Sequence, residues 1–112
     1  MFHRQMVVDS ITWQPQLPQM HFRRALEHAT VTKVWMNAAL VRARANAAIT
    51  RGTRISIGFG NARGLVAVRR VDPGADATMS DYRVEFLWLD PTLQTFFDDA
   101  APAGSPIHFD WP

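Results

Sequence analysis

The chain contains no cysteine, and this absence removes three kinds of chemistry at once. Without thiols there is no disulfide framework, no thiolate zinc site and no thiol nucleophile. Long apolar runs are also missing, since none approaches the ~18 residues of a membrane helix. Residues 1–20 lack the apolar core of a signal peptide. We therefore expect a protein that is not secreted through a signal peptide and that has no membrane partner.

Lysine is almost absent, because Lys33 is the one lysine beside eleven arginines. Residues 1–71 hold eleven of the twelve basic residues with two acids, a sum of +9, whereas residues 72–112 hold Arg83 with eight acids, a sum of −7. Such asymmetry suggests an electrostatic partner, either nucleic acid on the basic N-terminal part or another copy of the chain. The alternative is that the fold interleaves the two parts and cancels the field.

The 112 residues, 47% of them hydrophobic, fit one domain with its own core. We expect a single α+β domain over residues 1–112. Residues 1–18 are predicted to be an N-terminal strand or arm, because prolines 15 and 18 interrupt the chain there. Residues 101–112 are predicted to be a C-terminal tail.

The segment 19–51 contains neither proline nor glycine. Its apolar residues recur at steps of three and four, which predicts an amphipathic helix; they are Val31, Val34, Ala38, Val41, Ala45, Ala48 and Ile49. We expect one long Ala-rich helix, or a short helix over 19–29 followed by a long one over 31–51, because β-branched residues at 30–32 can break it. Gly52 then ends the helix.

The second part of the chain reads as strands and one short helix. Alternation predicts strands over 54–59, 65–71 and 82–89, with a hairpin connection at 60–64. Asp90 and Pro91 suit the start of a short helix that turns Leu93, Phe96 and Phe97 inward. The tail is strand-like. The expected class is α+β, with the long Ala-rich helix packed on a mainly antiparallel sheet of three to four strands, a short C-terminal helix and a terminal strand.

One strand carries most of the aromatic pattern. Tyr82, Val84, Phe86 and Trp88 share a face, which we expect to lie against the long helix. Phe86 and Trp88 are therefore predicted to be core residues that bind no ligand.

No pattern for catalysis, cofactor binding or metal binding is found. His21 and His28 are seven residues apart, too far for the i, i+4 pair of a zinc helix. The glycines at 58–64 are one residue too widely spaced for a dinucleotide loop, and a strand follows them. We predict no catalytic residue, no metal ligand and no cofactor, and expect a protein that is not an enzyme.

The order of a long Ala-rich helix, a hairpin and an aromatic-Arg-x-Glu-Phe strand resembles the tail-completion and head–tail joining proteins of long-tailed phages. The residues that carry the resemblance are 51–55 (RGTRI), 82–86 (YRVEF) and the pair Phe96-Phe97. Two positions depart from the family: Leu87 stands where a glycine usually follows, and Asp98-Asp99 stand where Arg-Pro usually follows. The resemblance implies a non-enzymatic subunit, cytoplasmic or in a virion, that forms a ring between capsid and tail.

A second resemblance gives the alternative function. Arg69-Arg70, followed by residues 81–84 (DYRV), is similar to the RelE/ParE-type toxins. It implies a toxin that acts on messenger RNA or gyrase. A small basic nucleic-acid-binding module is the other alternative.

The leading hypothesis is an assembly subunit that self-associates head-to-tail and binds other protein subunits. Its predicted interface consists of arginines, two acids and the apolar side chains of the tail: Arg42, Arg44, Arg51, Arg54, Arg69, Arg70, Asp98, Asp99, Ile107, Phe109 and Trp111. Arginine binds carboxylates and phosphates in forked geometry. The tail is expected to pair with a sheet edge or with a neighbouring subunit.

Overall fold

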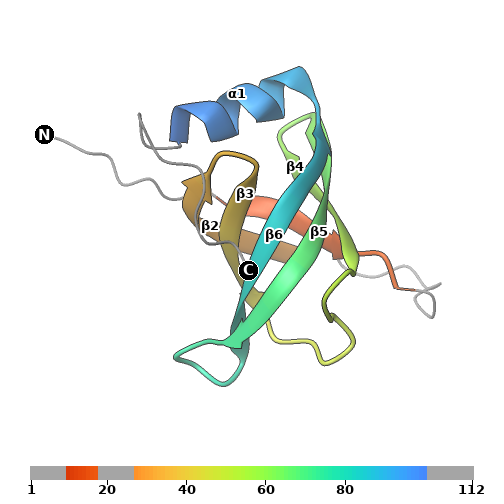
Figure 1. The fold of residues 1–112 in the computed structure, drawn as a ribbon, viewed down its shortest axis with the longest axis vertical. Helices are drawn as coiled ribbons and strands as arrows, with labels where there is room; N and C mark the ends of the chain where they lie inside the picture. The colour runs from red at the N-terminus through yellow and green to blue at the C-terminus, as the bar shows by residue number, and fades with distance from the viewer. Residues whose placement is uncertain (1–9, 18–26, 101–112) are drawn as a thin grey trace, which may run out of the picture.

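The structure, a computed structural model, describes residues 10–17 and 27–100 as six strands followed by one helix (Figure 1). The strands are β1 (Ser10–Pro15), β2 (Glu27–Trp35), β3 (Ala38–Arg44), β4 (Arg54–Phe59), β5 (Ala62–Pro73) and β6 (Met79–Leu89). The helix, α1, spans Pro91–Ala100.

The strands form a closed antiparallel barrel in the order β1-β2-β3-β6-β5-β4. Hairpins join β2 to β3, β4 to β5 and β5 to β6, and β1 pairs with both β2 and β4 to close the sheet. The pairing of β3 with β6 joins segments far apart in the sequence. Because the sheet closes on itself, each strand has one face toward the interior and one face outward.

The barrel interior is filled mainly by small and branched side chains. Buried alanines and valines from β2, β3, β5 and β6 form one core cluster with Trp13, whose ring lies 5.3 Å from that of Tyr82. Helix α1 lies across one end of the barrel (Figure 1). Its Leu93 and Phe97 are buried, and the Phe97 ring lies 4.6 Å from that of Phe86.

The predicted long helix is wrong, and with it the α+β class. Among the residues described, 27–44 form the hairpin β2–β3 and 45–53 form a loop. The spacing misled because Thr32 is an extra, bulged residue between Val31 and Lys33, so that buried Val31 and Val34 are three apart instead of two. Past the turn, Val41, Arg42, Ala43 and Arg44 alternate buried and exposed, as a strand does.

The turn between β2 and β3 explains the rest of that error. It consists of Met36 and Asn37, and Asn37 has φ of 92°, a conformation that asparagine tolerates better than most residues. Because the turn lies between them, buried Val34 and Ala38 are four residues apart, which is the spacing of a helical turn. The predicted helix over 19–29 lies mostly outside the described residues.

Predictions for the C-terminal part agree better with the structure. Strand β4 has the predicted bounds, whereas β5 and β6 are longer than predicted. The connection between β4 and β5 is a two-residue turn, Gly60-Asn61, because Phe59 pairs directly with Ala62. Phe59, which alternates with Ile55 and Ile57 in the sequence, is 39% exposed, whereas those two residues are buried.

Asp90 immediately precedes α1, which begins at Pro91 as predicted. Its carbonyl accepts the first helical bond, from the N–H of Gln94 at 2.8 Å. Its carboxylate accepts the backbone N–H of Arg63 at 2.8 Å, and the Arg63 carbonyl accepts the Asp90 N–H at 2.9 Å. Asp90 therefore fixes α1 to β5.

The two termini are described in part. Of the predicted N-terminal arm, Ser10–Pro15 is β1 and belongs to the barrel, whereas 1–9 lie outside the described residues. The tail 101–112 also lies outside them. Within the described ranges, no helix has both the length and the apolar character needed to cross a bilayer.

Candidate interaction surfaces

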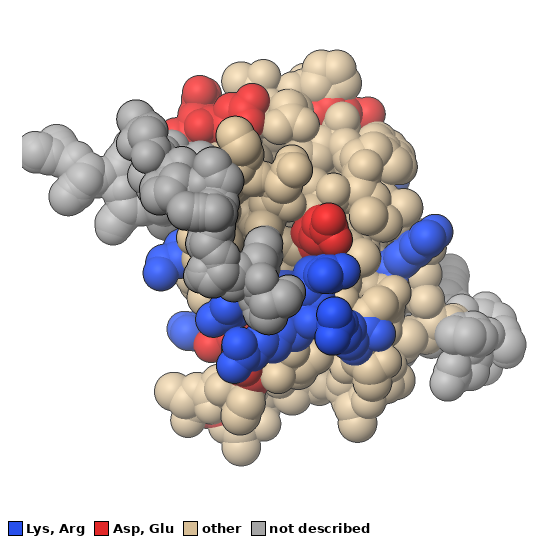
Figure 2. Space-filling model, viewed as in Figure 1, with Lys and Arg blue, Asp and Glu red and all other residues tan. Residues whose placement is uncertain are grey.

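Seven basic side chains occupy the outer surface of the barrel, and we call them the basic band. These side chains come from five different strands. The members of the basic band are Lys33, Arg42, Arg44, Arg54, Arg69, Arg70 and Arg83. Figure 2 shows lysines and arginines gathered across this face. Strand register is the cause, because outward positions of adjacent strands stand side by side.

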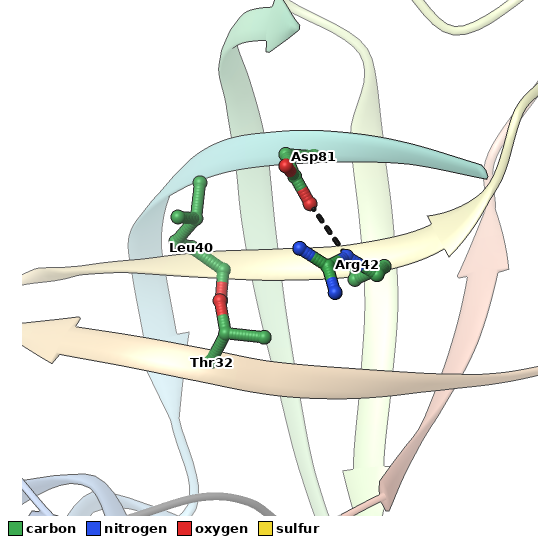
Figure 3. Close-up of polar contacts among 4 residues, drawn as sticks. All are labelled: Thr32, Leu40, Arg42 and Asp81. Carbon is green, nitrogen blue, oxygen red and sulfur yellow. Dashed lines mark hydrogen bonds and ion pairs between the residues drawn. The ribbon is translucent and has the colours of Figure 1, made fainter. Parts of the chain in front are cut away.

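Three acids lie among these cations and neutralise part of the band. The Arg42 Nε lies 3.0 Å from Asp81 Oδ1 (Figure 3), and the Arg70 Nε lies 3.1 Å from Asp72 Oδ1. Arg69 Nη1 lies 3.5 Å from a carboxylate oxygen of Glu85. Asp72 and Asp81 are themselves directly opposite on β5 and β6. The fold thus interleaves the two parts of the chain here.

This cancellation is incomplete. Seven cations against three acids leave +4 on the band, and Arg44, Arg54 and Lys33 form no ion pair with any residue in the described ranges. The Lys33 Nζ lies 5.5 Å from the centre of the Trp35 ring instead. The ion pairs are 20–50% exposed on each side, so each contributes little, about 0–1 kcal/mol, to stability. The band keeps cations available to an anionic partner.

The opposite charge gathers at α1, which has no Lys or Arg and ends in exposed Asp98 and Asp99. Together with Asp90 these residues form the acidic end of the molecule, and Figure 2 shows acidic side chains at the end of the barrel where α1 lies. Negative charge in the last turn interacts unfavourably with the helix dipole, which costs about 0.3–1 kcal/mol of stability per group. Gln94 Nε2 donates a hydrogen bond to Asp98 at 3.0 Å, but α1 has no basic side chain that would neutralise the charge of Asp98 and Asp99.

Large apolar side chains are exposed beside the band, and this overturns one prediction. Trp88 is 51% exposed and not a core residue, whereas Phe86 is half-buried and packs on the core. Leu87 and Met36 are 42% and 59% exposed. The N–H of Phe86 donates to the Asn37 carbonyl, which places the Met36–Asn37 turn beside this part of β6.

Bulges create much of this outer surface. Leu87 is an extra residue in β6, since Leu65 pairs with Trp88 and Val66 pairs with Phe86. Arg69 is the extra residue in β5, and Thr32 in β2. None of Thr32–Lys33, Arg69–Arg70 and Leu87–Trp88 is buried, so each bulge brings two successive side chains to the outer surface. Bulges commonly re-aim side chains near functional surfaces.

Of the predicted interface residues, Arg42, Arg44, Arg54, Arg69 and Arg70 are brought together in the basic band. Arg51 lies apart from them, exposed on the loop between β3 and β4, and Asp98 and Asp99 lie on α1. Ile107, Phe109 and Trp111 lie outside the described residues. Four residues of these surfaces were not predicted from the sequence: Lys33, Arg83, Leu87 and Trp88. For Lys33 the alternation gives no signal, because the bulge at Thr32 moves this residue to the outer face.

Within the described ranges, no three His, Cys, Asp or Glu side chains gather where they could hold a metal ion. Tyr82, part of the toxin-like motif, is fully buried, and its hydroxyl donates to the Arg44 carbonyl and accepts the N–H of Asn46. It therefore serves the barrel interior. His28 is exposed on β2, and the other histidines lie outside the described residues.

Comparisons with known proteins found no matching family model, no matching curated protein and no matching solved structure.

Proposed function

We propose that the protein is a non-enzymatic assembly subunit whose copies associate head-to-tail, the acidic end of one copy on the basic band of the next. The separation of charge on the described surface carries this proposal. The band keeps +4 after its own ion pairs, and α1 presents acids with no basic residue on the same helix. Opposite charges on different parts of one molecule favour contact between unlike patches.

An interface between unlike patches leaves one free patch at each end, so a series of copies closes into a ring or extends as a filament. A ring is what the resemblance to phage tail-completion and head–tail joining proteins implies. That setting, in the cytoplasm or in a virion, is part of the proposal and rests on the motifs at 51–55 and 82–86. The long helix that also carried the resemblance is not among the described elements, since residues 27–44 form strands β2 and β3.

Charge reversal tests the proposal. The variant Asp98→Arg/Asp99→Arg should lose assembly at low salt, and Arg44→Glu/Arg54→Glu should lose it as well. Combining all four substitutions leaves the band at 0 and the acidic end at +1, so it should not restore assembly. We chose Arg44 and Arg54 because they form no ion pair within the described residues, so their loss leaves no acid unpartnered there.

Beside the single variant Arg44→Glu, the control is Arg51→Glu, which makes the same change in net charge on an exposed residue outside the band. It should assemble like the unmodified protein. Light scattering coupled to size exclusion gives the mass in each case. If the reversed variants keep the mass of the unmodified protein at low salt, the proposal is wrong.

Nucleic-acid binding is a second candidate, because the band is rich in arginine and arginine also suits phosphate. Fluorescence anisotropy with labelled duplex DNA, at about 50 mM and about 200 mM salt, measures it. Binding that falls steeply with salt and is lost in Arg44→Glu/Arg54→Glu, with a monomeric protein, would favour this candidate over assembly.

A further inference from the structure

Trp88 and Leu87 form, with Met36 of the neighbouring turn, an apolar patch on the outer surface that we call the Trp88 patch. Trp88 is 51% exposed, although it follows buried Tyr82 and Val84 and half-buried Phe86 in the alternating pattern of β6. The bulge at Leu87 leaves Leu87 and Trp88 exposed together, while Leu89 packs against the core. An exposed Trp within an apolar group marks an interaction surface more often than an isolated exposed Leu does.

Basic residues flank the Trp88 patch on its barrel side. On β5, Leu65 pairs with Trp88, and Ala67, two residues further along, pairs with both Glu85 and Arg54. Arg69 reaches Glu85 at 3.5 Å, so this flank carries Arg54, Arg69 and one acid. Trp and Arg together are the residue types most enriched where binding energy concentrates.

A second apolar patch has the opposite rim. The rings of Phe59 and Phe96 stack with centres 4.7 Å apart, and Phe59 is 39% exposed. Asp99 follows Phe96 by three residues on α1, which puts both on one side of the helix, and Asp98 is adjacent. We call this group the Phe59 patch. It is apolar at its centre and acidic at its edge.

We infer that the Trp88 patch is the docking site for the Phe59 patch of a second copy of this chain. The inference rests on the proposed head-to-tail association and names its apolar centre. The two patches match in character and are opposite in charge. They also lie on different strands, β6 and β4, with β5 between them, so the contact joins unlike surfaces. Trp88 is the anchor, and the charged rims set the orientation.

Mixing two variants tests this pairing. Trp88→Ser removes the anchor and keeps the Phe59 patch, whereas Asp98→Arg/Asp99→Arg disrupts the acidic rim and keeps the Trp88 patch. Each variant alone should associate at least about tenfold more weakly than the unmodified protein, because truncating a central Trp commonly has effects of this size. An equimolar mixture should form a species of twice the 12.7 kDa chain mass, which light scattering detects.

Two controls separate assembly from folding. Val71→Ser changes an apolar residue on β5 that is 39% exposed, close to the 42% of Leu87, and should assemble like the unmodified protein. Leu87→Ser weakens the same patch without changing Trp88 and should reduce association as well. Circular dichroism should give the same spectrum for all variants, since all the substituted residues are exposed.

The outcomes distinguish the two proposals. If the unmodified protein is a monomer, the proposed function fails and takes this inference with it. If the unmodified protein associates and Trp88→Ser and Leu87→Ser associate equally well, the inference fails while head-to-tail association stands. If Trp88→Ser is monomeric but Asp98→Arg/Asp99→Arg still forms a dimer by itself, Trp88 meets its own copy across a two-fold axis, and the pairing with the Phe59 patch is wrong.

Discussion

The two parts of β6 use a similar sequence pattern to different ends. From Ser80 to Glu85 the strand alternates strictly, with Tyr82 and Val84 inside and charged residues outside. From Phe86 onward one extra residue interrupts the alternation and leaves Trp88 exposed. The regular part builds the barrel, and the bulged part builds a surface. The position of an aromatic residue in a pattern therefore did not decide its role; the local pairing did.

The largest effect is expected at Trp13 of β1, whose ring packs on Tyr82 in the regular part of β6. Trp13 is 1% exposed, and Trp13→Ala should lower the free energy of unfolding by about 3–5 kcal/mol because it leaves a cavity at the centre of the barrel. Chemical denaturation followed by circular dichroism measures this change. A loss below about 1 kcal/mol would show that the interior is not closed around this ring.

A larger residue at Gly64 of β5, opposite the bulged part of β6 and next to α1, should be poorly tolerated. Gly64 pairs with Leu89, and an added methyl group would lie 2.6 Å from Leu89 Cδ2 and 3.1 Å from Leu93 Cδ2. We expect Gly64→Ala to destabilise the protein by about 1–3 kcal/mol through overpacking. Thermal unfolding checks it. An unchanged midpoint would mean that α1 shifts freely on the barrel end.

The outer face of the regular part should contribute less. A double-mutant cycle on Arg42 and Asp81, each changed to Ala, should give a coupling of about 0.2–1 kcal/mol, because both groups are partly exposed. The same cycle in high salt should give a smaller value. A coupling well above 2 kcal/mol would instead make this pair a principal element of barrel stability.

Trp88→Ala should lower the free energy of unfolding of the monomer by much less than Trp13→Ala does, since the side chain is half exposed and its truncation leaves no closed cavity. Measured beside Trp13→Ala, it is the direct comparison of the two parts. A loss similar to that of Trp13→Ala would place Trp88 in the core after all.

The smallest effect is expected beyond both parts, at the turn between β5 and β6. Hydrogen bonds from the backbone N–H and the hydroxyl of Thr78 lower the pKa of Asp76 below its ordinary value of 3.8. The ionised form therefore adds stability above about pH 4, and this is lost as the pH falls through the lowered pKa. A carbon-detected NMR titration should give a midpoint below 3.8. Thr78→Ala should raise that midpoint, and no change would exclude the hydroxyl bond.

The strands of the C-terminal part could be predicted because their buried residues alternate strictly with outward ones. Examples are Ile55 and Ile57 in β4 and Tyr82 and Val84 in β6. The hairpin β2–β3 could not, because the bulge at Thr32 and the two-residue turn convert a period of two into steps of three and four. A bulge adds one residue to one strand, so buried residues on its two sides are three apart in the sequence, as they are in a helix.

The candidate surfaces divide in the same way. Charge asymmetry along the chain pointed to the arginines and to Asp98 and Asp99. It could not show that Asp72, Asp81 and Glu85 pair with those arginines, because that contact depends on the register of β3, β5 and β6. Trp88 was placed on the wrong side because its exposure depends on one unpaired residue, Leu87.

Association through unlike, oppositely charged surfaces is tested most directly by the mass of the unmodified protein in solution. Sedimentation velocity over a range of concentrations should show species heavier than the 12.7 kDa chain at low salt, with the average mass falling toward 12.7 kDa as salt screens the charges. A mass of 12.7 kDa at every concentration and at low salt would contradict head-to-tail association.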